Sequence, residues 1–186
     1  FKISFLIIPT AISERFREAG IPTALLDAEV ITAHFLKMQK YQLVTWNDRE
    51  ISAAEISAIE KGIKRRLKFE PVAYITGIKE FYSLEFIVTP DVLIPRPETE
   101  LVVDMAIYWA EYNSRVLDLC TGSGAIAVAL KHSRRDIDLC ASDVSDKALK
   151  IAEKNAESIL GKRKVHFFKG DLFSPFAGEK FDLIVS

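Results

Sequence analysis

The alternation of short apolar runs with helical patterns from Arg115 onward constrains the fold more than any other feature of this 186-residue sequence. The expected strands are 116–119, 137–141, 165–168 and 181–185, and the expected helices are 125–131 and 145–159. Strands that alternate with helices form parallel sheets, because each helix carries the chain back to the start of the next strand. The sequence therefore predicts an α/β fold with a doubly wound, Rossmann-like parallel sheet over residues 97–186.

The first seventy residues show helical rather than strand periodicity. One apolar stripe begins after Pro22 and Thr23 and consists of Ala24, Ala28, Ile31, Phe35 and Met38. A second stripe follows a capping box of Ser52 and Glu55, and it consists of Ile56, Ile59, Ile63 and Leu67. Residues three and four apart share one face of a helix, so these stripes predict a small helical domain over residues 1–71.

Residues 72–96 differ from both neighbours in composition. β-Branched and aromatic residues dominate this segment, and Gly77 and the Thr89-Pro90-Asp91 cluster provide turns. This pattern predicts a β-hairpin that connects the two domains. Helical signal returns from Pro97 to about Ala110, at the start of the α/β domain.

Composition and charge restrict the function classes. Hydrophobic residues make up 49% of the chain and charged residues 27%, which is typical of a folded protein and excludes a mainly disordered one. The net charge of −1 argues against a generally basic nucleic-acid binder. We find no apolar run of the roughly 20 residues that span a bilayer, and no cleavage site after the apolar start at 1–8. We therefore expect a cytoplasmic protein that does not cross a membrane.

The clearest candidate for a binding site is the glycine-rich segment 118–124, which follows an expected strand and opens an expected helix. Glycines there allow a tight turn and a close approach to a ligand, and the free amides of the helix start favour a negative group. Asp143 and Gly170-Asp171-Leu172 follow the next two strands. Because open parallel sheets bind ligands at the carboxyl ends of their strands, these segments predict a site for a nucleoside-containing cofactor.

The acid at Asp118 distinguishes between two such cofactors. Residues Gly122, Gly124 and Ala127 also satisfy the loose dinucleotide pattern, but a carboxylate just before this loop would repel a pyrophosphate. The amino group of S-adenosylmethionine would instead be attracted, so we expect that cofactor. The residues expected to bind it are Asp118, Cys120, Thr121, Gly122, Ser123, Gly124, Asp143, Asp171 and Leu172.

These motifs resemble those of class I methyltransferases, and a second stretch is more specific. Residues 92–100 read Val-Leu-Ile-Pro-Arg-Pro-Glu-Thr-Glu and are preceded by Phe81-Tyr82-x-Leu84-x-Phe86. Together with residues 66–77, they resemble the signature of the release factor glutamine methyltransferases, the PrmC/HemK family. The layout of helical domain, hairpin and nucleotide-binding domain is similar too, and the resemblance covers about 19–186.

The resemblance implies an activity and a role for each motif. Family members transfer a methyl group from S-adenosylmethionine to the glutamine amide in the Gly-Gly-Gln loop of peptide chain release factors. By position, residues 120–124 would hold the methionyl end, Asp143 the ribose, and Asp171 with Leu172 the adenine. The family usually has glycine where this chain has Cys120, which leaves less room for the ligand.

The family's catalytic motif is expected outside the given sequence. Asn-Pro-Pro-Tyr follows a strand like 181–186, and here the sequence stops at Ser186. The apolar final run and the initial Phe1 lead us to expect that both ends are cut. An amide nitrogen is a poor nucleophile that must be oriented by hydrogen-bond acceptors, so we expect no turnover from residues 1–186 alone.

Other functions and roles stay open at this point. The alternatives are an amino-methyltransferase of adenine or cytosine in nucleic acid, a non-catalytic cofactor-binding or protein-interaction fragment, and a nicotinamide oxidoreductase. Glu98, Glu100 and Arg96 could shape the cofactor pocket or brace the junction of the domains. A basic run consists of Lys61, Lys64, Arg65, Arg66 and Lys68. It could be a docking surface for an acidic partner or a solvated helix face.

The cysteines and histidines predict no further chemistry. Cys120 and Cys140 are expected as reduced thiols at the ends of neighbouring strands. The spacing of His34, His132 and His166 is not that of metal ligands.

Overall fold

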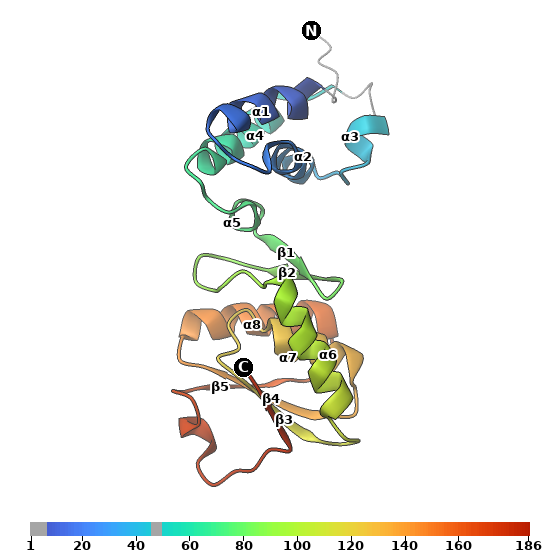
Figure 1. Cartoon of the computed structure of the whole chain (residues 1–186), viewed down its shortest axis with the longest axis vertical. Coiled ribbons are helices and arrows are strands. Elements are labelled where there is room, and N and C mark those ends of the chain that lie inside the picture. Colours follow the sequence, from blue (N-terminus) through green and yellow to red (C-terminus); the bar gives the residue numbers. More distant parts are fainter. Residues whose placement is uncertain (1–6, 46–49) are drawn as a thin grey trace. The chain divides into compact units, whose positions relative to one another are not determined.

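The computed structural model describes residues 7–45 and 50–186 (Figure 1). The chain divides into two compact units, residues 1–76 and residues 77–186, and each is described by itself. In the described part of the chain, no helix is both long enough and apolar enough to cross a membrane. The three-part division predicted from the sequence, at 71 and 96, stays a prediction.

The described part of the first unit is helical. Its helices are α1 (Ile7–Glu18), α2 (Ala24–Phe35), α3 (Gln42–Thr45), α4 (Ala53–Arg66) and α5 (Val72–Thr76). Its core is formed by α1, α2 and α4, with Phe16, Ile31 and Ile63 among the most deeply buried side chains. The helical stripe predicted for α2 is confirmed for Ala24, Ala28 and Ile31, which are all buried. Phe35 ends the helix and packs partly buried against the same core, but Met38 lies beyond the end of α2, so its assignment to the helix was wrong.

The start of α4 confirms the predicted capping box. Ser52 Oγ accepts the Glu55 N–H at 3.2 Å, and Glu55 Oε2 accepts the Ser52 N–H at 2.9 Å. The prediction that Ile56 belongs to the buried stripe was wrong, because this side chain is 47% exposed. Ile56 lies in the first turn of α4, at the edge of the core that buries Ile59 and Ile63.

The segment predicted as β-hairpin is partly helical. Residues Val72–Thr76 form α5, because the Pro71 carbonyl accepts the N–H groups of Tyr74 and Ile75 and so starts a helical turn. The hairpin itself is confirmed and belongs to the second unit, with β1 (Ile78–Phe81) antiparallel to β2 (Leu84–Ile87). Its two turn residues between the strands both have positive φ angles, as a tight hairpin turn requires.

The predicted parallel sheet is confirmed in the second unit. Its elements after the hairpin are η1 (Pro97–Thr99), α6 (Glu100–Trp109), β3 (Arg115–Leu119), α7 (Ala125–Ser133), β4 (Asp138–Asp143), α8 (Asp146–Leu160), β5 (His166–Lys169), η2 (Ser174–Phe176) and β6 (Leu183–Val185). The strand order is β5-β4-β3-β6, and all neighbouring strands are parallel. Sequential strands β3, β4 and β5 therefore present their carboxyl ends along one edge.

The two faces of the sheet are covered differently. Helices α6, α7 and α8 lie on one face (Figure 1), where Val116 and Leu139 are fully buried against Leu130. On the other face, Leu117 packs against Phe176 of η2. Alternate residues of β3 thus enter two different cores, which explains why this strand reads as a continuous apolar run.

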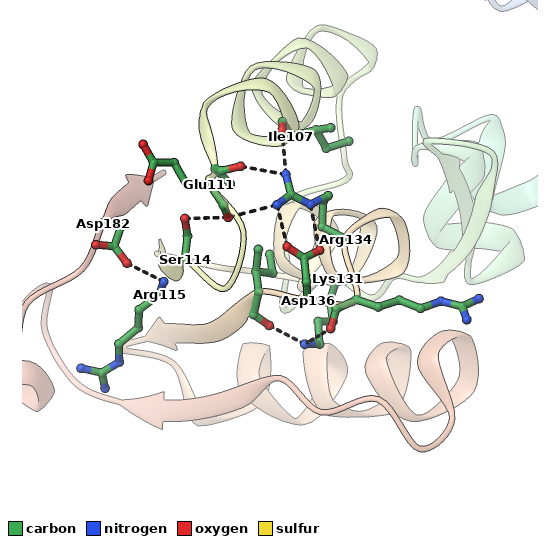
Figure 2. Close-up of polar contacts among 11 residues, drawn as sticks. Ile107, Glu111, Ser114, Arg115, Lys131, Arg134, Asp136 and Asp182 are labelled. Atoms are coloured by element: carbon green, nitrogen blue, oxygen red, sulfur yellow. Dashed lines mark hydrogen bonds and ion pairs between the residues drawn. The ribbon is translucent and has the colours of Figure 1, made fainter.

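Arg134 ties together the elements at the amino-terminal end of the sheet (Figure 2). Its guanidinium donates to the carbonyls of Ile107, Ala110 and Glu111 at 2.8–3.0 Å. Two further hydrogen bonds, of 2.9 and 2.7 Å, go to the Asp136 carboxylate. The free carbonyls at the end of α6 are therefore satisfied by a cation, which also suits the helix dipole.

Two more residues, Lys131 and Asp182, form hydrogen bonds at the same end of the sheet (Figure 2). Lys131 is buried, and its Nζ donates to the carbonyls of Ile137 at 2.6 Å and Arg135 at 3.3 Å. Asp182 accepts the Arg115 N–H through Oδ2 at 2.7 Å and donates its own N–H to the Arg115 carbonyl at 2.9 Å.

Candidate functional site

The three predicted site segments meet at the carboxyl ends of β3, β4 and β5. The N–H of Gly122, in the loop after β3, donates to Asp143 Oδ2 at 2.9 Å. The N–H of Gly170, after β5, donates to the Asp143 carbonyl at 3.1 Å. Asp143 at the end of β4 thus contacts both neighbouring loops. The structure brings these segments together as expected, while their binding of a ligand stays a prediction.

The loop after β3 has an unusual backbone. The φ angles of Cys120, Gly122 and Gly124 are +58°, +56° and +78°, so alternate residues are left-handed. Glycine adopts this conformation freely, but for Cys120 it costs about 1–2 kcal/mol. The Thr121 N–H donates to the Ser142 carbonyl of β4 at 2.9 Å and anchors the loop. Strain of this kind, held in place by hydrogen bonds, is typical of ligand-binding loops.

Gly122 and Gly124 have different surroundings. A Cβ atom on Gly124 would lie 3.0 Å from the Cβ of Ala152 in α8, so this glycine allows the loop and α8 to approach closely. Among the described residues, a Cβ on Gly122 would meet only the Cys120 carbonyl oxygen, at 4.0 Å. The space beside Gly122 is therefore not filled by other described parts of the chain and can admit a ligand.

Asp118 lies beneath this loop and is almost completely buried, with 1% of its surface exposed. Its Oδ2 accepts the Thr121 hydroxyl at 2.6 Å and the Ala127 N–H at 3.1 Å. Its Oδ1 is buried and has no hydrogen-bond partner among the described residues. Burial, with a smaller contribution from the charge of Asp143, raises the pKa of Asp118 to about 7 against the lowering effect of the two hydrogen bonds. An ammonium group would be a suitable partner for Oδ1.

Asp143 keeps acceptor capacity for a ligand. Its Oδ2 accepts the Gly122 N–H, and its Oδ1 accepts the Ser145 N–H at 2.9 Å. Each carboxylate oxygen can accept two hydrogen bonds, so one position remains on each. Two neighbouring hydroxyl groups, such as those of a ribose, match this arrangement.

Apolar side chains are exposed beside these polar groups. Val144 follows β4, and Leu172 and Phe173 follow β5; all three are more than half exposed. Leu172 has a positive φ of +46°, and the Asp171 carbonyl accepts the Ser174 N–H, which turns the chain into η2. Small-molecule sites combine apolar contacts with a few polar groups, and this edge offers both.

One residue that holds the site in place was missed from the sequence. Asn155 in α8 is fully buried and donates to the Ser123 carbonyl in the loop at 2.9 Å. The available signal was a polar residue on the apolar face of a helix, next to Ala152 and Ala156. Glu100, for which two roles were open, accepts the Tyr82 N–H at 2.9 Å and so holds the hairpin turn against α6.

The basic run in the first unit divides into two groups. Arg66 donates to Asp27 at 2.8 Å, and Arg65 donates to Glu70 and to the Tyr74 carbonyl. These two arginines stabilise the end of α4. Neither of the alternatives considered from the sequence, a docking surface or a merely solvated face, anticipated these pairs. The lysines of the run, Lys61, Lys64 and Lys68, are exposed.

The cysteines are free, as expected, but one was misplaced. Cys140 lies inside β4 rather than at its end, and it is buried, whereas Cys120 is exposed. Burial raises the pKa of the Cys140 thiol, which keeps it protonated. Over residues 7–45 and 50–186, no three His, Cys, Asp or Glu side chains are grouped so as to hold a metal ion.

Comparison with known proteins assigns both units. A family model of the PrmC N-terminal domain matches residues 10–77, and one of the methyltransferase small domain matches residues 100–186. A release factor glutamine methyltransferase of Leptospira interrogans serogroup Icterohaemorrhagiae serovar Lai (strain 56601) is 43% identical over 180 residues, which cover 94% of this chain and 63% of the relative.

Two further relatives carry the same name. That of Vibrio cholerae serotype O1 is 39% identical, over 95% of this chain and 62% of the relative. That of Escherichia coli (strain K12) is 36% identical, over 86% of this chain and 58% of the relative. The chain thus spans about 60% of the length of the curated relatives that it matches.

Proposed function

Because this chain belongs to the release factor glutamine methyltransferase family, we propose that its second unit binds S-adenosylmethionine and that the protein methylates a release factor. The acceptor is the side-chain amide of the glutamine in the Gly-Gly-Gln loop. One observation carries the cofactor proposal: Asp118 has a buried oxygen with no partner among the described residues, beneath a loop whose Gly122 faces open space. The names of the relatives support the substrate.

The cofactor's parts can be assigned to residues of this chain. The ammonium of the methionyl group pairs with Asp118, and its carboxylate lies at the amides that open α7, where the helix dipole favours negative charge. Asp143 accepts the two ribose hydroxyls with its remaining lone pairs. Leu172 and Val144, which are exposed and apolar, border the adenine, together with Asp171.

The bound cofactor would supply a methyl group on a positively charged sulfur. An amide nitrogen attacks poorly because its lone pair is delocalised, so its orientation decides the rate; well-aligned reactions gain about 7–11 kcal/mol in this way. We place the orienting groups in the Asn-Pro-Pro-Tyr motif of the family, which is not among residues 1–186. This chain's part in the reaction is to hold the cofactor.

Calorimetric titration of the chain with S-adenosylhomocysteine tests the cofactor proposal. We expect binding to residues 1–186 and none to Gly122→Val, whose side chain would enter the free space. Gly178→Val is the matched control, because Gly178 has the same left-handed conformation and open surroundings but lies far along the chain, before β6. No binding by the wild type, displacement by NAD, or equal binding by Gly122→Val would contradict the proposal.

Transfer of labelled methyl groups by the full-length protein tests the substrate. We expect label in the release factor and none in an oligonucleotide; the reverse result would favour methylation of nucleic-acid bases. We also propose that the first unit recognises the release factor, and that the protein acts in the cytoplasm. Removing residues 1–71 should then spare cofactor binding and slow methylation of the release factor, and equal rates would refute that role.

A further inference from the structure

Asn155 is the most deeply buried amide side chain near the candidate site, with 0% of its surface exposed. Burying an amide costs free energy unless its hydrogen-bonding groups find partners. Here Oδ1 accepts the Ile87 N–H at 2.7 Å, and Nδ2 donates to the Ile87 carbonyl at 3.0 Å and to the Ser123 carbonyl at 2.9 Å. The amide therefore uses its acceptor and both of its donor hydrogens.

Both bonds to Ile87 lie on the edge of β2 that faces away from β1. The side chain pairs with the N–H and the carbonyl of one residue, as a neighbouring strand would. Two bonds to the same residue fix the plane of the amide. The remaining Nδ2 hydrogen is therefore aimed in one direction, toward the Ser123 carbonyl.

The loop is held from α8 at two consecutive residues. Asn155 binds the carbonyl of Ser123, and Ala152, one turn earlier on the same helix face, packs against Gly124. Gly122 directly precedes them and donates to Asp143. A shift of the Ser123 carbonyl would rotate the loop backbone at 122–124 and move the Gly122 N–H away from its acceptor, Asp143.

We infer that Asn155 is a positioning residue for cofactor binding, and that β2 of the hairpin supports it. In this arrangement the hairpin stabilises the cofactor loop through one buried amide, although Ile87 itself takes no part in the site. The inference rests on the proposed binding of S-adenosylmethionine. It gives the hairpin a role in the cofactor site, although no hairpin residue is among those proposed to contact the ligand.

A pair of proline variants tests the hairpin's part. Ile87→Pro removes the N–H that Asn155 accepts, and that N–H points away from β1, so the hairpin ladder keeps its hydrogen bonds. Glu85→Pro is the matched control, since residues two apart on a strand have the same orientation and Glu85 lies two residues from the contact. We expect Ile87→Pro to weaken S-adenosylhomocysteine binding about three- to tenfold and Glu85→Pro to leave it unchanged.

Asn155→Leu tests the amide itself, because leucine keeps the branched shape and the length of the side chain but cannot form the three hydrogen bonds. We expect affinity for S-adenosylhomocysteine to fall at least about tenfold. Amide hydrogen exchange, measured without ligand, should become faster both in the loop at 120–126 and in β2 at 84–88. If this variant does not fold, Ile87→Pro still decides, because it leaves α8 unchanged and should speed exchange in the loop.

The outcomes separate this inference from the proposed function. Variants Asn155→Leu and Ile87→Pro that only lower the melting temperature, with wild-type affinity and wild-type exchange at 120–126, would overturn the role of Asn155. A wild-type chain that fails to bind S-adenosylhomocysteine would overturn the proposed cofactor instead. In that case, faster loop exchange in Ile87→Pro would still support the coupling of hairpin and loop.

Discussion

The two ends of the parallel sheet are built on opposite principles. At the amino-terminal end, Arg134 and Lys131 satisfy the carbonyls where helices end and strands begin, and Asp182 pairs with Arg115 (Figure 2). At the carboxyl-terminal end, alternate loop residues are left-handed, and Asp118 retains a buried oxygen without a partner in the described part of the chain. One end saturates its hydrogen bonds, and the other end leaves some unsatisfied.

This difference implies that the two ends of the sheet serve different purposes, the amino-terminal end stability and the carboxyl-terminal end binding. A saturated network stabilises the fold but has no capacity left for a ligand. A strained loop over a buried carboxylate lowers stability, and a ligand that satisfies these groups recovers the difference on binding. Changes at the amino-terminal end should therefore reduce the free energy of unfolding, and changes at the carboxyl-terminal end should reduce affinity.

The largest expected effect is at the amino-terminal end. Arg134→Ala removes the hydrogen bonds to three carbonyls and leaves Asp136 without its cation, so the free energy of unfolding should fall by about 3 kcal/mol. Urea denaturation measures this loss. The neighbouring Arg135→Ala, at an exposed side chain, should change it by less than about 0.5 kcal/mol. A loss of cofactor affinity in folded Arg134→Ala would contradict the separation of stability and binding between the two ends of the sheet.

The second prediction concerns affinity. Asp143→Ala removes the acceptor for the ribose and the anchor of the Gly122 N–H, so binding of S-adenosylhomocysteine should weaken by about 1.5–3 kcal/mol. Titration calorimetry gives this value. Asp146→Ala removes a nearby exposed carboxylate that pairs with Lys169, and it should bind normally. Normal binding by Asp143→Ala would mean that the site is misplaced.

A third prediction separates packing from backbone strain at the loop. Gly124→Ala places a Cβ 3.0 Å from Ala152 and imposes left-handed strain, whereas Gly178→Ala imposes the strain alone. The strain costs about 1–2 kcal/mol, so Gly124→Ala should lose more stability than Gly178→Ala by a further amount of about 1 kcal/mol. Thermal or urea unfolding of both variants measures the difference. Equal losses would show that α8 does not hold the loop at Gly124.

The fourth prediction is a pH dependence of stability caused by Asp118. Its pKa is about 7 in the folded chain and near the ordinary 3.8 when unfolded, so the folded state retains a proton that the unfolded state releases. The free energy of unfolding should therefore fall as pH rises from about 4 to about 7, and then level off.

Asp118→Asn isolates this effect, because the amide oxygen still accepts from Thr121 and Ala127 but no longer titrates. Asp143, the charged group that also raises the pKa of Asp118, is kept in both proteins. Urea unfolding of variant and wild type at about pH 5 and about pH 8 gives the difference in slope. A difference in stability that is the same at both pH values would contradict the raised pKa.

Much of the fold could be predicted, because its signals are local. Apolar periodicity located the four strands of the sheet, and Ser52 and Glu55 marked the start of α4 by a local hydrogen-bond pattern. Val72–Thr76 was assigned to the hairpin because its residues favour strands, and the helix there depends on the Pro71 carbonyl. Exposure of Ile56 could not be predicted, since it depends on where the core ends rather than on helical phase.

The site was predictable to the level of segments. Asp118, Gly122 and Asp143 are recognisable because each lies at or just after the carboxyl end of a strand, and parallel topology brings these strand ends together. The role of Asn155 was not recognisable, because its partner Ile87 is far away in sequence and becomes a neighbour only when the hairpin packs on α8. The pairing of Arg66 with Asp27 was missed for the same reason.

The separation of the two ends of the sheet is tested most directly by following the backbone amide signals of the isotope-labelled chain during titration with S-adenosylhomocysteine. We predict that shifts are confined to the carboxyl-terminal end, at 118–124, at Asp143 and at 171–172. The amides of Ser114, Lys131, Arg134 and Asp182 should stay unchanged. Shifts centred on the amino-terminal end, or no shifts at saturating ligand, would contradict the account.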